Sequence, residues 1–241
     1  SAIARRGAIA VALNHPNSTW RDYDMSKGIH HWTRVLDMQR ALDHVLAHPD
    51  FASTVDMDRI MALGFSYGGW TALSIGGLRG NHFGFVSACE RLKDVSPICD
   101  QLLSQHINVQ GVDPKVWNDT YKDKRITHVF AIDPALVWGL IPTDTPALTE
   151  NRIPIGLGDK ADRLVDTDFD ASGLAQNLSP KTMYRLVPAT HFSAMPLCKP
   201  QGVAILAAEK DDPVCTDPVG ADRSKIHQTI IDHLAQTLDL K

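Results

Sequence analysis

Short apolar runs along this chain alternate with longer stretches that carry apolar residues at helical spacing. Continuous apolar runs bounded by turn-forming residues are typical of strands buried on both faces, and such strands belong to parallel sheets. The alternation therefore predicts an α/β fold with a mostly parallel sheet flanked by helices. The predicted strands are residues 7–13, 59–65, 126–132, 153–157 and 182–187.

Helical periodicity is clearest over residues 31–48, where apolar side chains recur every three or four positions until Pro49 interrupts the pattern. Residues 68–75 follow a predicted strand directly and can begin a second helix there. Two further predicted helices are a short one over 170–178 and a closing amphipathic one over 223–240.

Residues 80–125 interrupt this regular order. Periodicity fades there among scattered Gly, Pro, Cys and charged residues, which indicates an irregular helical insertion and a candidate cap. Since no linker, repeat or low-complexity tract divides the chain, we expect residues 1–241 to form one domain.

Charge and hydropathy exclude two classes of partner. The formal net charge is -4 and no basic stripe runs along the chain, which argues against a nucleic-acid partner. No apolar run approaches the roughly 20 residues that a membrane-spanning helix needs. We therefore expect no nucleic acid and no membrane span.

A Gly-Phe-Ser-Tyr-Gly stretch over residues 64–68 matches the pattern G-x-S-x-G. It lies where a predicted strand turns into a predicted helix, the setting of a nucleophile elbow. We expect glycine at both ends because side chains two residues either side of the serine would collide in so sharp a turn. The turn would present Ser66 as a nucleophile and leave the Tyr67 backbone N–H free to stabilise an oxyanion.

A serine nucleophile needs a base, and the base needs an orienting acid. His191 follows the last predicted strand on a loop, and the other histidines fit that place less well. Asp162 and Asp159 lie in the loop after the strand 153–157, in the usual chain order of serine, acid, histidine. Asp162 is the first choice and Asp159 the alternative acid. Asp133, directly after the strand 126–132, is a third candidate.

The four cysteines form two local pairs in sequence. They are either unrelated thiols or two short-range disulfides, Cys89–Cys99 and Cys198–Cys215, which would require an oxidising compartment. A zinc site is not expected because no C-x-x-C pair is present. The run Asp166, Asp168, Asp170 lacks the glycine and the closing glutamate of a calcium loop, so no metal is expected.

With these residues in place, the sequence resembles the dienelactone-hydrolase and platelet-activating-factor-acetylhydrolase-like branch of the α/β-hydrolases. Nearly the whole chain takes part in the resemblance. The elbow is similar to that of the whole superfamily, and the cysteine-containing tail is similar to that of periplasmic members. The stretches that carry it are GAIAVALNHPNST, MALGFSYGGW, GDKADRLV with VPATHF, and the run from His191 through Cys198 to DDPVCTDPVGADR.

The resemblance implies a catalytic α/β-hydrolase domain with a Ser66, Asp162 and His191 triad. It implies hydrolysis of small-molecule carboxylic esters or lactones through an acyl-enzyme, without a cofactor, and an exported, periplasmic or secreted enzyme. Dienelactone hydrolases themselves use a cysteine nucleophile, so the serine at position 66 argues against that specific reaction.

Family members carry earlier strands and an H-G-x-x-G stretch that supplies the second oxyanion donor, and nothing in this chain matches that stretch. The resemblance therefore implies that this is the C-terminal portion of the fold. A separate N-terminal chain or segment would supply the missing strands, and cleavage just before Ser1 would produce two chains.

Two other functional classes remain open at this point. The same triad can act on amides, thioesters or carbon–carbon bonds next to carbonyls, because a fold does not determine its chemistry. The protein could also be a non-catalytic, hydrolase-like binding protein whose site has decayed.

Overall fold

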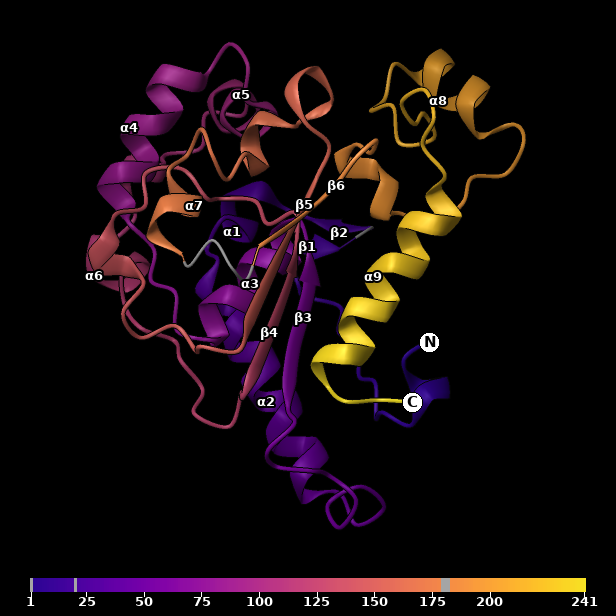
Figure 1. The fold of residues 1–241 in the computed structure, drawn as a ribbon. Coiled ribbons are helices and arrows are strands. Elements are labelled where there is room, and N and C mark those ends of the chain that lie inside the picture. The colour runs from indigo at the N-terminus through magenta and orange to yellow at the C-terminus, as the bar shows by residue number, and fades with distance from the viewer. Residues whose placement is uncertain (1, 20, 179–182) are drawn as a thin grey trace.

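The computed structural model describes residues 2–19, 21–178 and 183–241. Its centre is a parallel sheet with the strand order β3-β4-β5-β6 (Figure 1). The strands are β3 (Met61–Phe65), β4 (His128–Ile132), β5 (Arg152–Leu157) and β6 (Tyr184–Leu186). These confirm four of the predicted strands, although Thr182, the predicted start of the last one, lies outside the described residues.

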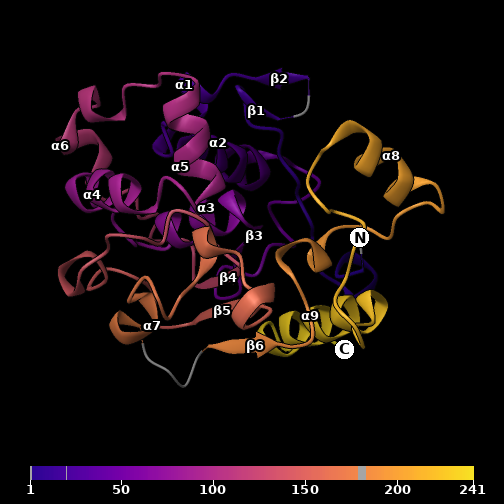
Figure 2. The same ribbon diagram turned by 90° about the horizontal axis from the view of Figure 1, so that it is seen from above.

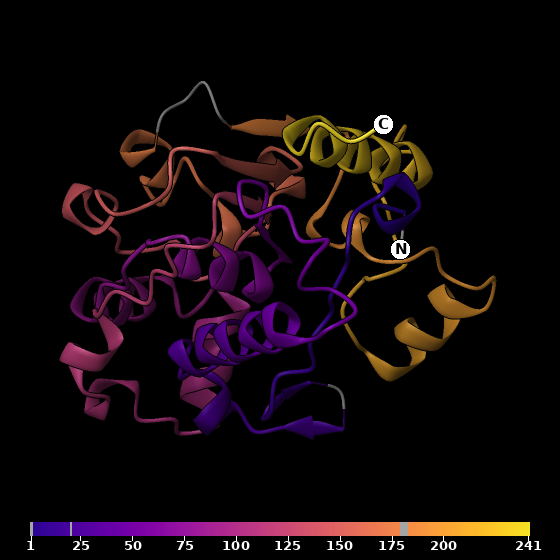
Figure 3. The same cartoon turned by 90° about the horizontal axis from the view of Figure 1, so that it is seen from below.

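Helices cover both faces of this sheet. On one face α3 (Tyr67–Ile75) packs on β3 and β4, with α2 (Trp32–Ala47) behind it, and α9 (Arg223–Thr237) lies on the opposite face (Figure 3). β4 shows the consequence, since its successive side chains enter the two cores in turn. Val129 belongs to the core under α3, whereas Phe130 belongs to the core under α9. The predicted α/β fold with a parallel sheet between helices is confirmed.

The segment 80–125 is helical, as predicted, and it packs as part of the body. The side chains of Phe85, Leu102 and Trp117 are buried in the same core as α2 and α3. Its helices are α4 (His82–Leu92), α5 (Pro97–Ser104) and α6 (Pro114–Trp117). The smaller elements elsewhere are β1 (Ser18–Thr19), β2 (Asp22–Tyr23), α1 (Met25–Gly28), α7 (Leu174–Asn177) and α8 (Gly202–Glu209).

The prediction of a buried strand over residues 7–13 is wrong. Residues 8–15 have no strand structure, and Ile9 and Val11 are 44% and 56% exposed. A parallel strand is buried only when it has a neighbour to pair with. Among the described residues no strand pairs with this segment, nor with the outer edge of β3, where Leu63 is 45% exposed.

Both short-range disulfides are present in the structure. Cys89–Cys99 links α4 to α5, and Cys198–Cys215 closes the loop that carries α8. α8 has no buried residue and projects from the body (Figure 2). Disulfides of this kind are compatible with an oxidising, extracellular or periplasmic compartment.

No helix in the described part of the chain has the length and apolar character needed to cross a membrane.

His31, at the start of α2, is fully buried among aromatic rings. Its ring makes edge contacts with Trp32, Trp70 and Trp117, and its Nε2–H donates to the Trp117 carbonyl at 3.1 Å. Burial lowers the pKa of His31 from 6.5 to about 3. The core under α3 therefore holds a neutral imidazole that must take up a proton when the protein unfolds in acid.

This histidine predicts a pH dependence of stability. Since the folded-state pKa lies below the unfolded value, the stabilisation is complete above pH 6.5 and is lost as the pH falls toward 3. One proton taken up on unfolding lowers the free energy of unfolding by about 1.4 kcal/mol for each pH unit of acidification. We expect His31→Gln to reduce the slope of unfolding free energy against pH by up to this amount. The measurement is urea unfolding of both proteins between pH 4 and 7, with the exposed His44→Gln on the same helix as control. Equal slopes in the wild type and His31→Gln would contradict the prediction.

Candidate active site

The sharp turn between β3 and α3 places Ser66 at the carboxyl end of the sheet. Ser66 has φ 53°, a left-handed conformation that is uncommon outside glycine. Its N–H donates to the Ile132 carbonyl at 2.9 Å, which ties the turn to β4. The backbone strain is thus held by the neighbouring strand, as a nucleophile elbow requires.

Only one of the two glycines of the motif is required by crowding. A Cβ at Gly64 would overlap the Gly68 carbonyl, whereas a Cβ at Gly68 would meet no atom within 4 Å. The prediction that both positions are crowded is therefore wrong for Gly68. Gly69 does allow close packing, because its Cβ would lie 3.0 Å from the Cα of Pro134.

Three side chains form a continuous hydrogen-bonded chain at this edge. His191 Nε2 lies 3.0 Å from Ser66 Oγ, and His191 Nδ1 lies 2.7 Å from Asp133 Oδ2. An imidazole that donates from Nδ1 to a carboxylate leaves Nε2 able to accept the serine proton. The arrangement can therefore activate Ser66 as a nucleophile.

The structure corrects the expected acid. Asp133, the third candidate, contacts His191, whereas Asp162 and Asp159 are exposed and belong to a turn that begins after β5. The reason is strand register, because Phe65 pairs with Ile132 and the next residues of the two strands are Ser66 and Asp133. Chain order does not separate the three acids, because all of them lie between Ser66 and His191 in the sequence. The loop context of Asp162 favoured it, whereas the position of Asp133 directly after a predicted strand was the signal for the acid that contacts His191.

Asp133 is fully buried and accepts hydrogen bonds from four protein groups. Its Oδ1 accepts from the Leu157 N–H at 2.9 Å and from the Arg163 guanidinium, and its Oδ2 accepts from Thr167 Oγ1 at 2.8 Å as well as from His191. The sequence reasoning did not include Arg163 or Thr167. They replace the water that an exposed carboxylate would bind.

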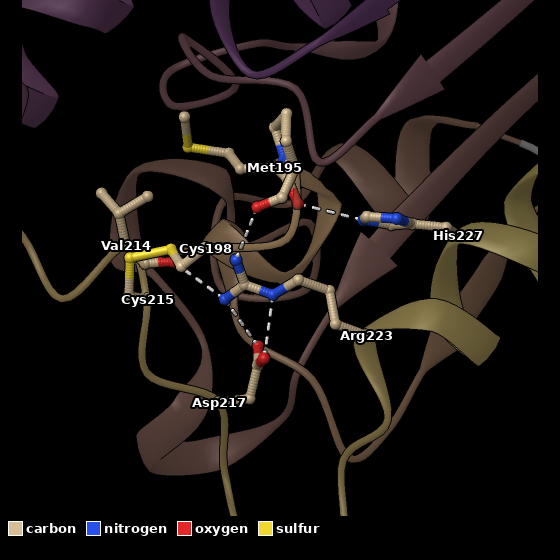
Figure 4. The surroundings of a disulfide bond; sticks show 8 residues. Met195, Cys198, Val214, Cys215, Asp217, Arg223 and His227 are labelled. Atoms are coloured by element: carbon tan, nitrogen blue, oxygen red, sulfur yellow. Dashed lines mark hydrogen bonds and ion pairs between the residues drawn. A yellow bond between two sulfur atoms is a disulfide. The ribbon is translucent and has the colours of Figure 1, made fainter. Parts of the chain in front are cut away.

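The loop of His191 is anchored by a network next to the second disulfide (Figure 4). Asp217 accepts from Ser193 Oγ at 2.6 Å. Figure 4 shows its pairing with Arg223, at 2.9 Å. Arg223 also donates to the Val214 carbonyl at 2.8 Å, next to Cys215. The cysteine-containing segment therefore supports the turn His191–Ala194 that holds the imidazole.

A second buried carboxyl, Asp166, lies in the neighbourhood of His191. Burial raises the pKa of Asp166, and the hydrogen bond from Ser96 and the charge of His191 oppose that rise. Asp170, from the same acidic run, pairs with Arg185 at 2.6 Å. Asp168, the middle carboxylate of this run, accepts from the N–H groups of Asp170 and Ala171, so protein groups engage all three carboxylates.

The backbone N–H of Tyr67 lies in the first turn of α3, where N–H groups have no partner within the helix. The phenol is engaged elsewhere, since Tyr67 Oη donates to the Gly28 carbonyl at 2.6 Å and Arg34 lies over the ring. Burial raises the pKa of this phenol, so it stays neutral. Tyr67 therefore can serve an oxyanion through its main chain and not through its side chain.

Comparison with known proteins returned no matching family model, no matching curated protein and no matching solved structure.

The reassigned acid makes a direct prediction. Asp133→Asn would let an amide donate to His191 Nδ1, which places the proton on Nε2 and blocks acceptance from Ser66. We expect the reaction of Ser66 with a fluorophosphonate to slow by about 10³–10⁴-fold. Asp162→Asn, the matched control at the exposed site, should react at the wild-type rate. The measurement is labelling followed by intact mass, and a slow Asp162→Asn beside a normal Asp133→Asn would reverse the assignment.

Proposed function

We propose that this protein is a serine hydrolase with an α/β-hydrolase fold that cleaves carboxylic esters or lactones. The proposal rests on one observation, the hydrogen-bonded chain from Ser66 through His191 to Asp133. The elbow geometry and the parallel sheet with helices on both faces support it. The choice of esters and lactones rests on the family resemblance.

In the first half of the reaction, Ser66 Oγ attacks the ester carbonyl while His191 Nε2 takes the hydroxyl proton. Asp133 keeps the imidazole in the required tautomer and stabilises the imidazolium. The tetrahedral oxyanion receives a hydrogen bond from the Tyr67 N–H. Collapse breaks the bond to the alcohol, which leaves with the proton from His191.

In the second half, water attacks the acyl-enzyme and His191 takes a proton from it. The new tetrahedral intermediate collapses, the Ser66 oxygen leaves, and His191 returns the proton to it. The product is the carboxylic acid, or the hydroxy acid when the substrate is a lactone. No step requires a cofactor.

We propose a periplasmic or secreted location for this enzyme. The support is the pair of disulfides, Cys89–Cys99 and Cys198–Cys215, since such bonds persist in oxidising compartments.

We also propose that a separate N-terminal chain or segment completes the fold at the outer edge of β3. The Ser66 N–H donates to the Ile132 carbonyl, and the Ile60 carbonyl accepts from the His128 N–H, so residues 60 and 66 direct their backbone groups to β4. Backbone groups alternate sides along a strand, so residues 61, 63 and 65 direct theirs to the opposite, outer edge. Such an edge pairs readily with another strand. A strand there would end beside Ser66, where a second oxyanion donor is required. Ser1, at the proposed cleavage point, lies outside the described residues.

The edge proposal predicts that the 241 residues alone are insufficient for full activity. Lacking one oxyanion donor typically costs on the order of 10²–10³ in kcat. The test is to express the whole reading frame. Intact mass should then show polypeptide in addition to these residues, and hydrogen exchange should show that the Leu63 amide is protected. A stable and fully active chain of these residues alone would contradict the proposal.

The hydrolase proposal predicts that Ser66→Ala abolishes hydrolysis of p-nitrophenyl acetate and butyrate and labelling by a fluorophosphonate. The serine oxygen is the only atom removed, so folding should be unchanged by circular dichroism. Labelling of Ser66 without ester hydrolysis would favour an amide, thioester or carbon–carbon bond as the target. No labelling in the completed assembly would favour a non-catalytic binding role.

A further inference from the structure

Arg163 is the residue near the site that the reaction described above leaves without a task. Its side chain is 7% exposed and forms an ion pair with Asp133, which is 0% exposed. The guanidinium also donates to the carbonyls of Leu157 and Thr167. A buried arginine with this many partners is held in one position.

The surroundings of the guanidinium are built to accommodate it. The ring of Phe169 lies under it, 4.9 Å from the ring centroid to Cζ. Gly156 on β5 leaves the space, because a Cβ there would come within 3.0 Å of Arg163 Nη1. The loop that was expected to supply the acid thus supplies a cation to the acid of the neighbouring strand.

The ion pair between Arg163 and Asp133 changes the charge that His191 faces. A buried carboxylate beside a neutral imidazole is an uncompensated charge and stabilises the imidazolium strongly. With Arg163 in contact, Asp133 is already neutralised before His191 gains a proton. Removing the cation would leave the charge of Asp133 to be balanced by His191, which favours the protonated imidazole, and a protonated imidazole cannot act as a base.

We propose that Arg163 is a positioning residue that holds the Asp133 carboxylate in place and balances its charge, and thereby sets the lower end of the pH range in which Ser66 reacts. This inference rests on the proposed function. It acts through Asp133, because the contacts of the guanidinium are with Asp133, Leu157, Thr167 and Phe169.

Other charged groups around His191 are accounted for separately. Asp166 interacts with it electrostatically from the turn Val165–Thr167. Asp217, which accepts from Ser193, is paired with Arg223, and His227 Nε2 donates to the Ser193 carbonyl at 3.0 Å. Arg163 forms no ion pair with Asp166 or Asp217, so the carboxylate that loses its cationic partner on substitution at position 163 is Asp133.

The test is the rate of fluorophosphonate labelling of Ser66 between pH 4.5 and 9. In Arg163→Met, which removes the charge at similar size, we expect the acidic limb of the profile to move up by about 1 pH unit. Labelling below the limb should then fall by about tenfold. Arg163→Lys should keep the limb in place but react more slowly at every pH, because a lysine retains the charge and loses the fork of hydrogen bonds.

Arg185→Met is the matched control. Arg185 lies over the same Phe169 ring at 5.5 Å but pairs with Asp170 instead of Asp133. Its profile should match the wild type. If Arg163→Met does not fold, Arg163→Gln removes the charge and keeps amide donors for the Leu157 carbonyl.

A folded Arg163→Met or Arg163→Gln whose acidic limb coincides with the wild type overturns the inference, as does an equal shift in Arg163→Lys. In both cases the wild-type protein is still labelled at Ser66, so the hydrolase proposal is not contradicted. If wild-type protein is labelled no faster than Ser66→Ala, the proposed function itself fails, and this inference fails with it.

Discussion

The hydrogen bond between His191 and the buried carboxylate of Asp133 is the interaction on which the site depends. A carboxylate that is fully removed from water must have every lone pair occupied, and four donors from the protein meet this need. These donors come from β5, from two turns that follow it, and from the base itself. The position of the His191 imidazole therefore depends on how β5 and the two turns after it pack around Asp133.

The parallel sheet makes this arrangement geometrically simple. Carboxyl ends of neighbouring parallel strands lie at the same edge, so the residues after β3 and β4 are brought together by register alone. His191 arrives from the turn after β6, and its loop is held by Asp217 and Arg223 next to the second disulfide. Ser66, with its strained backbone, thus faces an imidazole whose loop is independently anchored.

The apolar sequence of residues 8–13 does not match their mostly exposed surroundings. Residues 8–13 are apolar and residues 9–12 among them are exposed, and the outer edge of β3 is unpaired among the described residues. The unpaired N–H and C=O groups of an edge strand pair readily with another strand. β3 is the end strand of the described sheet, and Ser66 follows it directly, so an unpaired edge lies next to the candidate site.

Local patterns in the sequence were enough to predict the parallel sheet, the helices 31–48 and 223–240, and the elbow at Ser66, because buried strands, amphipathic helices and sharp turns each leave a signature within a few residues. The place of His191 on a loop after the last predicted strand was enough to select it as the histidine facing Ser66. The partner of His191 was decided by tertiary structure, since the register between β3 and β4 brings Asp133 to Ser66 and leaves Asp162 in solvent. The exposure of Ile9 and Val11 and the contact of Arg163 with Asp133 were likewise decided there, because both depend on neighbours that are distant along the chain.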